Sequence, residues 1–195
     1  MLDEKAAHIE NDGVSITITR TPTSYTGKAT ISRFKGSYSD YATQNRRLMN
    51  LLLASSLATG EIVTAGSESY LTVVSKKEVV QGTDVSIIAH GMLCNATLTV
   101  TRDAPTYDAY GNQTGSTTTT VISAVACRAD VVNAAMRLVD PGLLASTVLK
   151  VYAKNDSSLV LLDKATVNGN YYRVDAIDTL EFPGCMVLQL SAWTG

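Results

Sequence analysis

Apolar and polar residues alternate along most of this chain, which is the period of a half-buried β-strand rather than that of a helix. The first clear example spans residues 15–20, where Ile16 and Ile18 fall on one face and threonines on the other. Threonine and serine are abundant, and tyrosine (9) outnumbers phenylalanine (2), a composition that favours strands. The pattern therefore predicts an all-β protein.

The first strand pattern returns in the second half of the chain. Residues 97–107 repeat the pattern of residues 15–25 without a gap, through a turn that contains proline and ends in tyrosine. Later blocks follow in the same order, and they pair 62–66 with 165–169 and 70–82 with 172–184. An ordered series of matches indicates a tandem duplication rather than a chance likeness between threonine-rich strands.

Each copy has room for five or six short antiparallel strands, a number that closes most economically into a small barrel or sandwich. We therefore expect two tandem β-barrel or sandwich domains, at residues 15–94 and 95–195, after a flexible arm at residues 1–14. Residues that favour tight turns separate the strands within each copy. These fold-defining turn residues are Gly66, Gly82, Asn168, Gly169, Pro183 and Gly184.

The second copy carries a long polar insertion at residues 103–119, where the first copy has only a short turn. A segment of this length inside a compact domain is usually functional or disordered. The threonine run at 117–120 favours extended structure, so a protruding hairpin is an alternative to a loop. The candidate functional residues of the segment are Asp103, Tyr107, Asp108, Tyr110, Gly111, Asn112 and Gly115.

One segment departs from the strand period. Apolar residues from Val131 to Leu138 fall at helical spacing, and Asp130 before them is a suitable N-cap. The Pro-Gly pair at 141–142 then stops the segment. We expect a short helix packed on the barrel, and at most short helices elsewhere.

Charge and cysteine content exclude several classes of protein. The formal net charge is −2, and nine acidic residues balance nine basic ones up to Met92, so neither half has the surplus of Lys and Arg that a nucleic-acid reader needs. No apolar run approaches the roughly 18 residues of a membrane helix, and no leader pattern is present, so we expect synthesis in the cytoplasm and no membrane partner. Cys94, Cys127 and Cys185 are too widely spaced to predict a disulfide framework or a zinc site.

Catalytic constellations are also missing from the sequence. Only His8 and His90 could serve as a histidine base, and neither lies in a recognisable motif. Asp175, Asp178 and Glu181 resemble a carboxylate cluster, but strand periodicity puts 175 and 178 on opposite sides, so a solvated hairpin edge is expected. With no phosphate-binding loop and no ligand-spaced Cys or His pair, we expect no cofactor, no metal and no enzymatic activity.

Five short motifs of the second copy carry a resemblance to a known family. They are Arg137-Leu-Val-Asp-Pro-Gly-Leu-Leu144, Leu149-Lys-Val-Tyr-Ala153, Asp163-Lys-Ala-Thr-Val-Asn-Gly169, Tyr172-Arg-Val174 and Pro183-Gly184. On these motifs the second copy resembles the head-closure proteins of tailed bacteriophages, small neck proteins that are also called stoppers or head-to-tail joining proteins. The resemblance covers roughly residues 97–193. The first copy matches only through its likeness to the second, and members of the family usually have a single such domain, so the duplication is a departure.

This resemblance implies a structural virion protein, made in the cytoplasm of the bacterial host, that forms a ring homo-oligomer, a hexamer or dodecamer, in the neck. Its partners would be the portal or adaptor, the tail proteins and the packaged DNA, which it would contact without reading sequence. In similar proteins a loop projects into the DNA channel and plugs it after packaging. The insertion at residues 103–119, acidic at Asp103 and Asp108, is the expected plug.

Two alternatives stay open at this point. A tail-terminator or tail-tube-type phage protein uses comparable β-barrels in rings. A monomeric β-sandwich binding module is a second alternative, with the long insertion as its recognition site. The C-terminal copy has both the family motifs and the insertion, so we expect it to have the active role, while the N-terminal copy widens or extends the ring.

Overall fold

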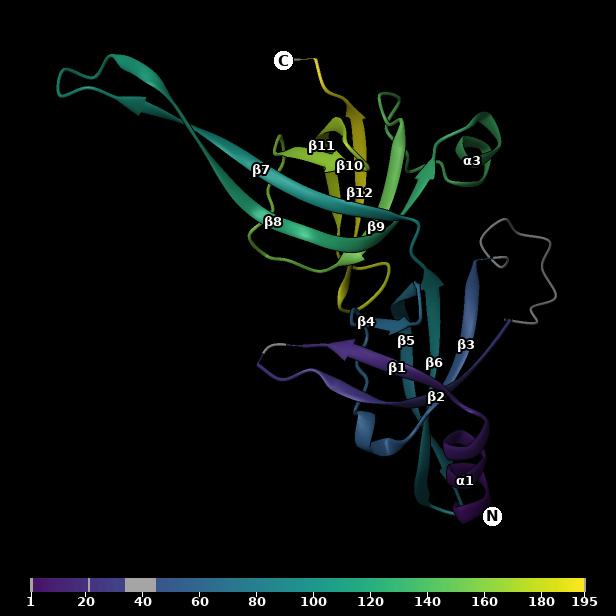
Figure 1. Cartoon of the computed structure of the whole chain (residues 1–195). Coiled ribbons are helices and arrows are strands. Elements are labelled where there is room, and N and C mark those ends of the chain that lie inside the picture. The colour runs from purple at the N-terminus through teal and green to yellow at the C-terminus, as the bar shows by residue number, and fades with distance from the viewer. Residues whose placement is uncertain (1, 21, 34–44, 195) are drawn as a thin grey trace. The chain divides into compact units, whose positions relative to one another are not determined.

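The computed structural model describes residues 2–20, 22–33 and 45–194. The chain divides into two compact units, one of residues 1–94 with 182–185 and the other of residues 95–181 with 186–195. Each unit contains one closed, six-stranded antiparallel β-barrel (Figure 1). The prediction of two tandem all-β folds with only short helices is therefore confirmed.

The first barrel closes in the order β1-β2-β3-β6-β5-β4, with β4 returning to β1. Its core consists of the interior-facing residues of each strand, such as Ile16, Ile18, Met49 and Val63, all of which are buried. A single 3-10 turn, η1 (Leu53–Ser55), follows the third strand. The strands are β1 (Val14–Thr19), β2 (Tyr25–Arg33), β3 (Arg46–Leu51), β4 (Ile62–Ala65), β5 (Glu68–Val80) and β6 (Thr83–Leu93).

The second barrel closes in the order β10-β11-β12-β9-β8-β7, with β7 returning to β10. Its core is again built from alternate residues, including Leu98, Val151, Val174 and Leu188. The strands are β7 (Ala96–Tyr107), β8 (Gln113–Val131), β9 (Leu149–Lys154), β10 (Lys164–Val167), β11 (Asn170–Asp178) and β12 (Cys185–Ala192).

The two barrels have the same topology. Strands β1 to β6 of the first barrel correspond in order to β7 to β12 of the second, and corresponding strands have corresponding neighbours. They also share a local irregularity. The register of β5 against β6 shifts around Val73, and the register of β11 against β12 shifts around Asp175, which stands 102 residues later. A bulge is a specific backbone feature, so its return at the same place supports the duplication.

One detail of the predicted repeat is wrong. The sequence match aligned residues 62–66 with 165–169, glycine against glycine. In the barrels, Thr19 pairs with Ile62 and its counterpart Thr101 pairs with Lys164, so residue 62 corresponds to residue 164. The strand pairing therefore aligns residues 62–65 with 164–167, one residue away from the alignment that the sequence predicted.

The turn residues lie between strands. Asn168 and Gly169 join β10 to β11 with φ values of 47° and 83°, the two positive values that a type I′ turn needs. Gly82 lies at the β5–β6 turn after Gln81, and both have positive φ. Of the other predicted turn residues, Gly66 lies at the β4–β5 turn, and Pro183 and Gly184 lie just before β12.

The predicted flexible arm at residues 1–14 is wrong in its structure. Most of it forms α1 (Leu2–Asp12), and the Gly13 amide donates to the Ile9 carbonyl at 3.0 Å where the helix ends. Ile9 is buried, and the Lys5 ammonium pairs with the Glu78 carboxylate on β5. The buried Ile9, this ion pair and a hydrogen bond from the Lys28 ammonium to the Glu10 carbonyl thus hold the helix on the first unit.

The helix of the second unit also differs from prediction. It is α3 (Ala134–Val139), and its N-cap is Asn133, whose side chain accepts from the Met136 amide at 2.9 Å. The predicted N-cap, Asp130, lies in β8, because that strand continues to pair with β9 as far as Val131. No α3 residue is buried, so the helix does not pack its apolar residues on the barrel as expected. Within the described residues, no helix is long and apolar enough to cross a membrane.

Candidate functional site

Residues 103–119 form the end of a long two-stranded ribbon rather than a loop (Figure 1). Strand β10 pairs with β7 only as far as Thr101. Beyond that point β7 and β8 pair only with each other, from Arg102 opposite Thr119 to Tyr107 opposite Gln113. The ribbon therefore leaves the second barrel as a projecting hairpin, which was the alternative that its threonine content favoured.

Asp108 organises the tip of this ribbon. Its Oδ1 accepts hydrogen bonds from the backbone amides of Tyr110, at 2.8 Å, and Asn112, at 2.9 Å. The hydrogen bonds from Asn112 are the main cause that lowers the pKa of the Asp108 carboxyl below its usual value. Gly111 takes a φ of 83°, a value that glycine adopts without steric cost. The tip is thus an ordered turn held by one carboxylate.

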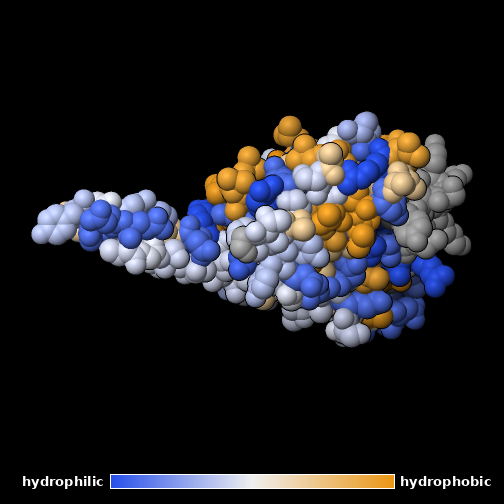
Figure 2. Space-filling view, turned by 90° about the horizontal axis from the view of Figure 1, so that it is seen from above, coloured by the Kyte–Doolittle hydropathy of each residue, from blue (hydrophilic) through white to orange (hydrophobic). Residues whose placement is uncertain are grey.

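The ribbon surface is mostly polar, and its two large aromatic side chains are tyrosines. The Tyr110 side chain at the tip is 90% exposed, and Tyr107 is 61% exposed. Residues 103–119 contain two carboxylates, Asp103 and Asp108, and no Lys or Arg. Figure 2 shows the projecting arm almost entirely in the blue and white of hydrophilic residues. Gly115, opposite Thr106, lies in the returning strand and not in the tip turn.

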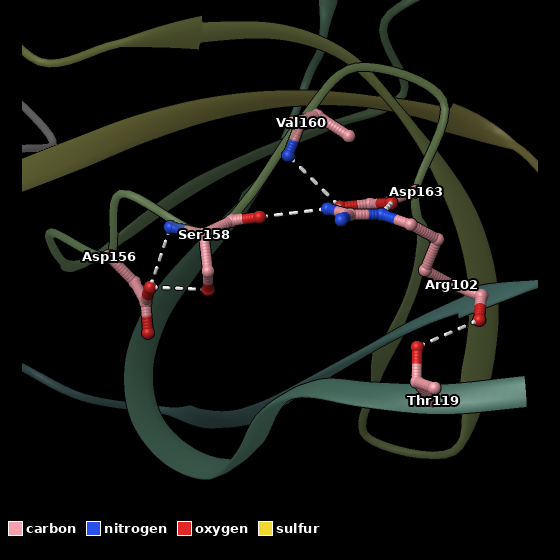
Figure 3. Close-up of polar contacts among 6 residues, drawn as sticks. All are labelled: Arg102, Thr119, Asp156, Ser158, Val160 and Asp163. Carbon is pink, nitrogen blue, oxygen red and sulfur yellow. Dashed lines mark hydrogen bonds and ion pairs between the residues drawn. The ribbon is translucent and has the colours of Figure 1, made fainter.

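Arg102 anchors the base of the ribbon (Figure 3). Its guanidinium donates to both oxygens of Asp163, each at 2.7 Å, and to the Ser158 carbonyl at 2.8 Å. The Asp163 side chain is only 2% exposed. Its carboxylate also accepts from the Val160 amide at 3.0 Å. A bidentate pair of this kind fixes orientation as well as distance, so it holds the last barrel-paired part of β7 against the loop before β10.

The first barrel contains the same clamp. Arg20 donates to both oxygens of Glu61, at 2.5 and 2.7 Å, and to the Ser56 carbonyl at 3.0 Å. The Glu61 carboxylate accepts from the Ala58 amide at 2.8 Å, as Asp163 accepts from Val160. Each acid, serine and amide of this clamp stands 102 residues before its counterpart. The clamp therefore belongs to the duplicated scaffold rather than to the ribbon alone.

Sequence reasoning missed this clamp, although the chain contains a signal for it. Each copy contains a Ser-Ser-Leu triplet just before the acid of the clamp. Its leucine stands four positions before that acid, at Leu57 before Glu61 and at Leu159 before Asp163. Both leucines are buried in the cores of their barrels. The repeated triplet and acid thus mark a loop that is held in place by the clamp in each barrel.

Two bulges in β8 mark the point where the ribbon departs. Val121 has no partner on β7, and the register shifts again around Ala124, whose φ is 43°. The Ala124 amide donates to the Thr99 hydroxyl at 3.3 Å. Bulges bend a strand and increase its twist, so this pair sets the direction in which the ribbon leaves the barrel.

The acidic residues of the β11 end do not form a cluster. Asp175 is held by the Arg173 guanidinium at 2.8 Å and the Ser146 hydroxyl at 3.0 Å, and its side chain is nearly buried, not solvated as expected. Glu181 lies 3.6 Å from the Lys150 ammonium. Across the described part of the chain, no group of three or more His, Cys, Asp and Glu is placed to hold a metal ion.

No protein-family model matches this chain, and no curated protein matches it. Among solved structures, it is similar to one described as the complex of K. pneumonia MrkH with c-di-GMP. Sequence identity is 7%, over 97% of this chain and 84% of that chain, and the TM-score is 0.20. A likeness this weak carries no argument about fold or function.

Proposed function

We propose that this protein is a structural, non-enzymatic neck component of a tailed bacteriophage virion. In this role it assembles as a ring between the portal or adaptor and the tail, and it closes the DNA channel after packaging. The second barrel projects its ribbon into the channel as the plug. The observation that best supports this role is the ribbon itself, a polar, acidic hairpin anchored at its base and exposed on both faces.

The charge of the ribbon suits contact with packaged DNA. Asp103 and Asp108 are its only charged residues beyond Arg102. Tight phosphate binding requires several Lys or Arg side chains, because affinity comes from neutralising phosphates and releasing their counterions. A plug with carboxylates alone stops DNA by occupying space and does not hold it, so it can withdraw when DNA leaves.

Ring assembly needs self-complementary surfaces that are not used inside the subunit. The second unit exposes several large apolar side chains that its own core does not use. Such residues, when they gather on a surface, are typical of protein contacts. Exposed apolar residues of this unit include Val131, Leu138 and Val139 in and around α3, and Val160, Leu161 and Leu162 in the loop before β10.

A shortened ribbon tests the plug directly. Asp103 pairs with Thr118, so residues 104–117 can be replaced by an Asn-Gly turn without changing the register of the barrel. Virions assembled with this variant should form normally and lose packaged DNA. The matched control is Tyr110→Ala, which keeps the length of the ribbon. Full DNA retention by the shortened variant would refute the plug.

Two other functions compete with this one. A tail-terminator or tail-tube-type protein would also form a ring, and its loss would leave DNA retained in heads that lack normal tails. A monomeric binding module is favoured by the tip, where exposed Tyr107 and Tyr110 lie among Gly, Asn and Thr, a composition typical of recognition loops. For that module, Tyr110→Ala would abolish binding and no ring would form.

A further inference from the structure

One end of the first barrel opens into a cavity of about 550 Å³. Its wall includes the last interior-facing positions of several strands and the buried core residue Tyr70, together with Ser15, Ser32 and Gly66. Val14, Ile31 and Ala65 supply an apolar side, while Arg33, Arg47 and Glu68 supply a charged side. The volume lies within the range of about 300–1,000 Å³ that is usual for small-molecule sites, and the mouth of a barrel is a common place for one.

Two arginines lie side by side in the wall of this cavity. Arg33 on β2 pairs directly with Arg47 on β3. They continue the interior-facing rows of their strands, which include the buried Ala29 and Met49. Like charges directly opposite each other on paired strands repel, so an anion bound between the two guanidiniums would be stabilised by both.

Tyr70 and Glu68 complete the polar wall. The Arg47 guanidinium hydrogen bonds the Tyr70 phenol, and that phenol donates to the Glu68 carboxylate. Glu68 therefore balances one of the two guanidiniums through the tyrosine. The described lining residues thus include two guanidiniums and one carboxylate, so they favour a ligand that carries negative charge.

The second barrel provides an internal comparison. Ile16 pairs with Gly27 and its counterpart Leu98 pairs with Val125, so Arg33 corresponds to Val131. Just as Arg33 pairs with Arg47, Val131 pairs with Leu149.

The position of Glu68 is taken by Asn170, 102 residues later, at the start of β11. The same fold thus closes without any of these three charges. Because the scaffold does not need them, their presence in the first copy alone points to a ligand.

We propose that the mouth of the first barrel binds a small organic oxyanion. Its carboxylate or phosphate group lies between Arg33 and Arg47, and its apolar body lies against Val14, Ile31 and Ala65. Guanidinium groups match both oxyanions because they offer paired N–H donors in one plane. This site is independent of the ribbon and of the neck function.

Calorimetric titration of the full chain tests the site, with benzoate as the carboxylate probe and phenyl phosphate as the phosphate probe. At least one of the two binds the wild-type chain at a stoichiometry of one, and the better binder identifies the oxyanion. The variant Arg33→Val/Arg47→Leu installs the pair that the second barrel already uses. It weakens binding at least about tenfold, because both charge-assisted donors are lost.

Two controls make the result decisive. Arg173→Ala removes an arginine from the second barrel and should leave binding unchanged, which excludes a general charge effect. Arg33→Gln removes one exposed guanidinium with little disturbance of the core. It should weaken binding too, so it tests the site even if the double variant does not fold. No binding of either probe to the wild-type chain, or equal binding by the wild type and the arginine variants, overturns the proposal.

Discussion

Arg102 and Asp163 stand 61 positions apart in the chain, yet they form a two-fold hydrogen-bonded ion pair at the base of the ribbon. The first barrel repeats the contact with Arg20 and Glu61. The pair therefore serves two purposes in the second unit. It holds the loop before β10 at one end of the barrel, as the matching pair holds the loop before β4 in the first copy, and it fixes the strand from which the ribbon extends.

Removal of the buried carboxylate should destabilise the second unit. Asp163→Ala removes the acceptor of the Val160 amide and leaves the Arg102 guanidinium with only the Ser158 carbonyl among the acceptors of the clamp, so the unfolding free energy should fall. Urea denaturation followed by far-UV circular dichroism measures the loss. Asp156→Ala is the matched control, since Asp156 bonds only the neighbouring Ser158 and its loss should cost much less. Equal losses in the two variants would contradict the role of the clamp.

Leu162 offers a stabilising substitution. Its φ is 70°, and the corresponding residue of the first copy is Gly60, with a φ of 82°. A left-handed backbone costs a leucine about 1–2 kcal/mol, which exceeds the entropic cost of glycine. Leu162→Gly should therefore raise the melting temperature. The control is Leu161→Gly, because Leu161 has no positive φ, and this variant should lower the melting temperature. A lower melting temperature in both variants would contradict the strain at residue 162.

The alkaline stability of the first unit should depend on Tyr70. Burial, followed by its hydrogen bond to Glu68, raises the pKa of Tyr70 to about 12. Because the folded pKa lies above the unfolded value of about 10, this stabilisation is complete below pH 10 and disappears as the pH rises through 12. Between these values the unfolding free energy of the wild type should fall more steeply than that of Tyr70→Phe. Parallel curves would contradict the shift.

The order of the ribbon tip should depend on Asp108 alone. Asp108→Ala removes the acceptor of the Tyr110 and Asn112 amides, so hydrogen exchange at these two amides should accelerate while the melting temperature hardly changes. Asp103→Ala is the control, because Asp103 bonds only the Thr118 hydroxyl across the ribbon. If exchange at the tip is the same in both variants, Asp108 does not organise the turn.

The strand pattern of the sequence was sufficient to predict two tandem all-β domains, each a barrel or a sandwich. Ile16 and Ile18 alternate with threonines because one face of β1 is buried, and the same pattern at 97–102 indicates the second copy. Residue identity misled the alignment of one turn. The match of Gly66 with Gly169 fails because Gly66 takes the first turn position, which the second copy gives to Asn168.

The features that sequence reasoning missed depend on contacts between distant residues. Nothing near Ile9 indicates that α1 will find a place on the barrel, since its anchor, Glu78, lies in β5. Asp130 is a good N-cap by type, but strand pairing with Lys150 prevails there. The two arginine clamps join residues 41 and 61 positions apart, so no local sequence pattern shows which acid each arginine contacts.

Solution mass tests the central claim most directly. Native mass spectrometry and negative-stain imaging of the purified chain, alone and mixed with portal, should detect a closed ring of six or twelve copies of the 20.8 kDa chain in at least one sample. Six copies correspond to about 125 kDa and twelve to about 250 kDa. A strict monomer in both samples, with no ring on the portal, would contradict the neck function.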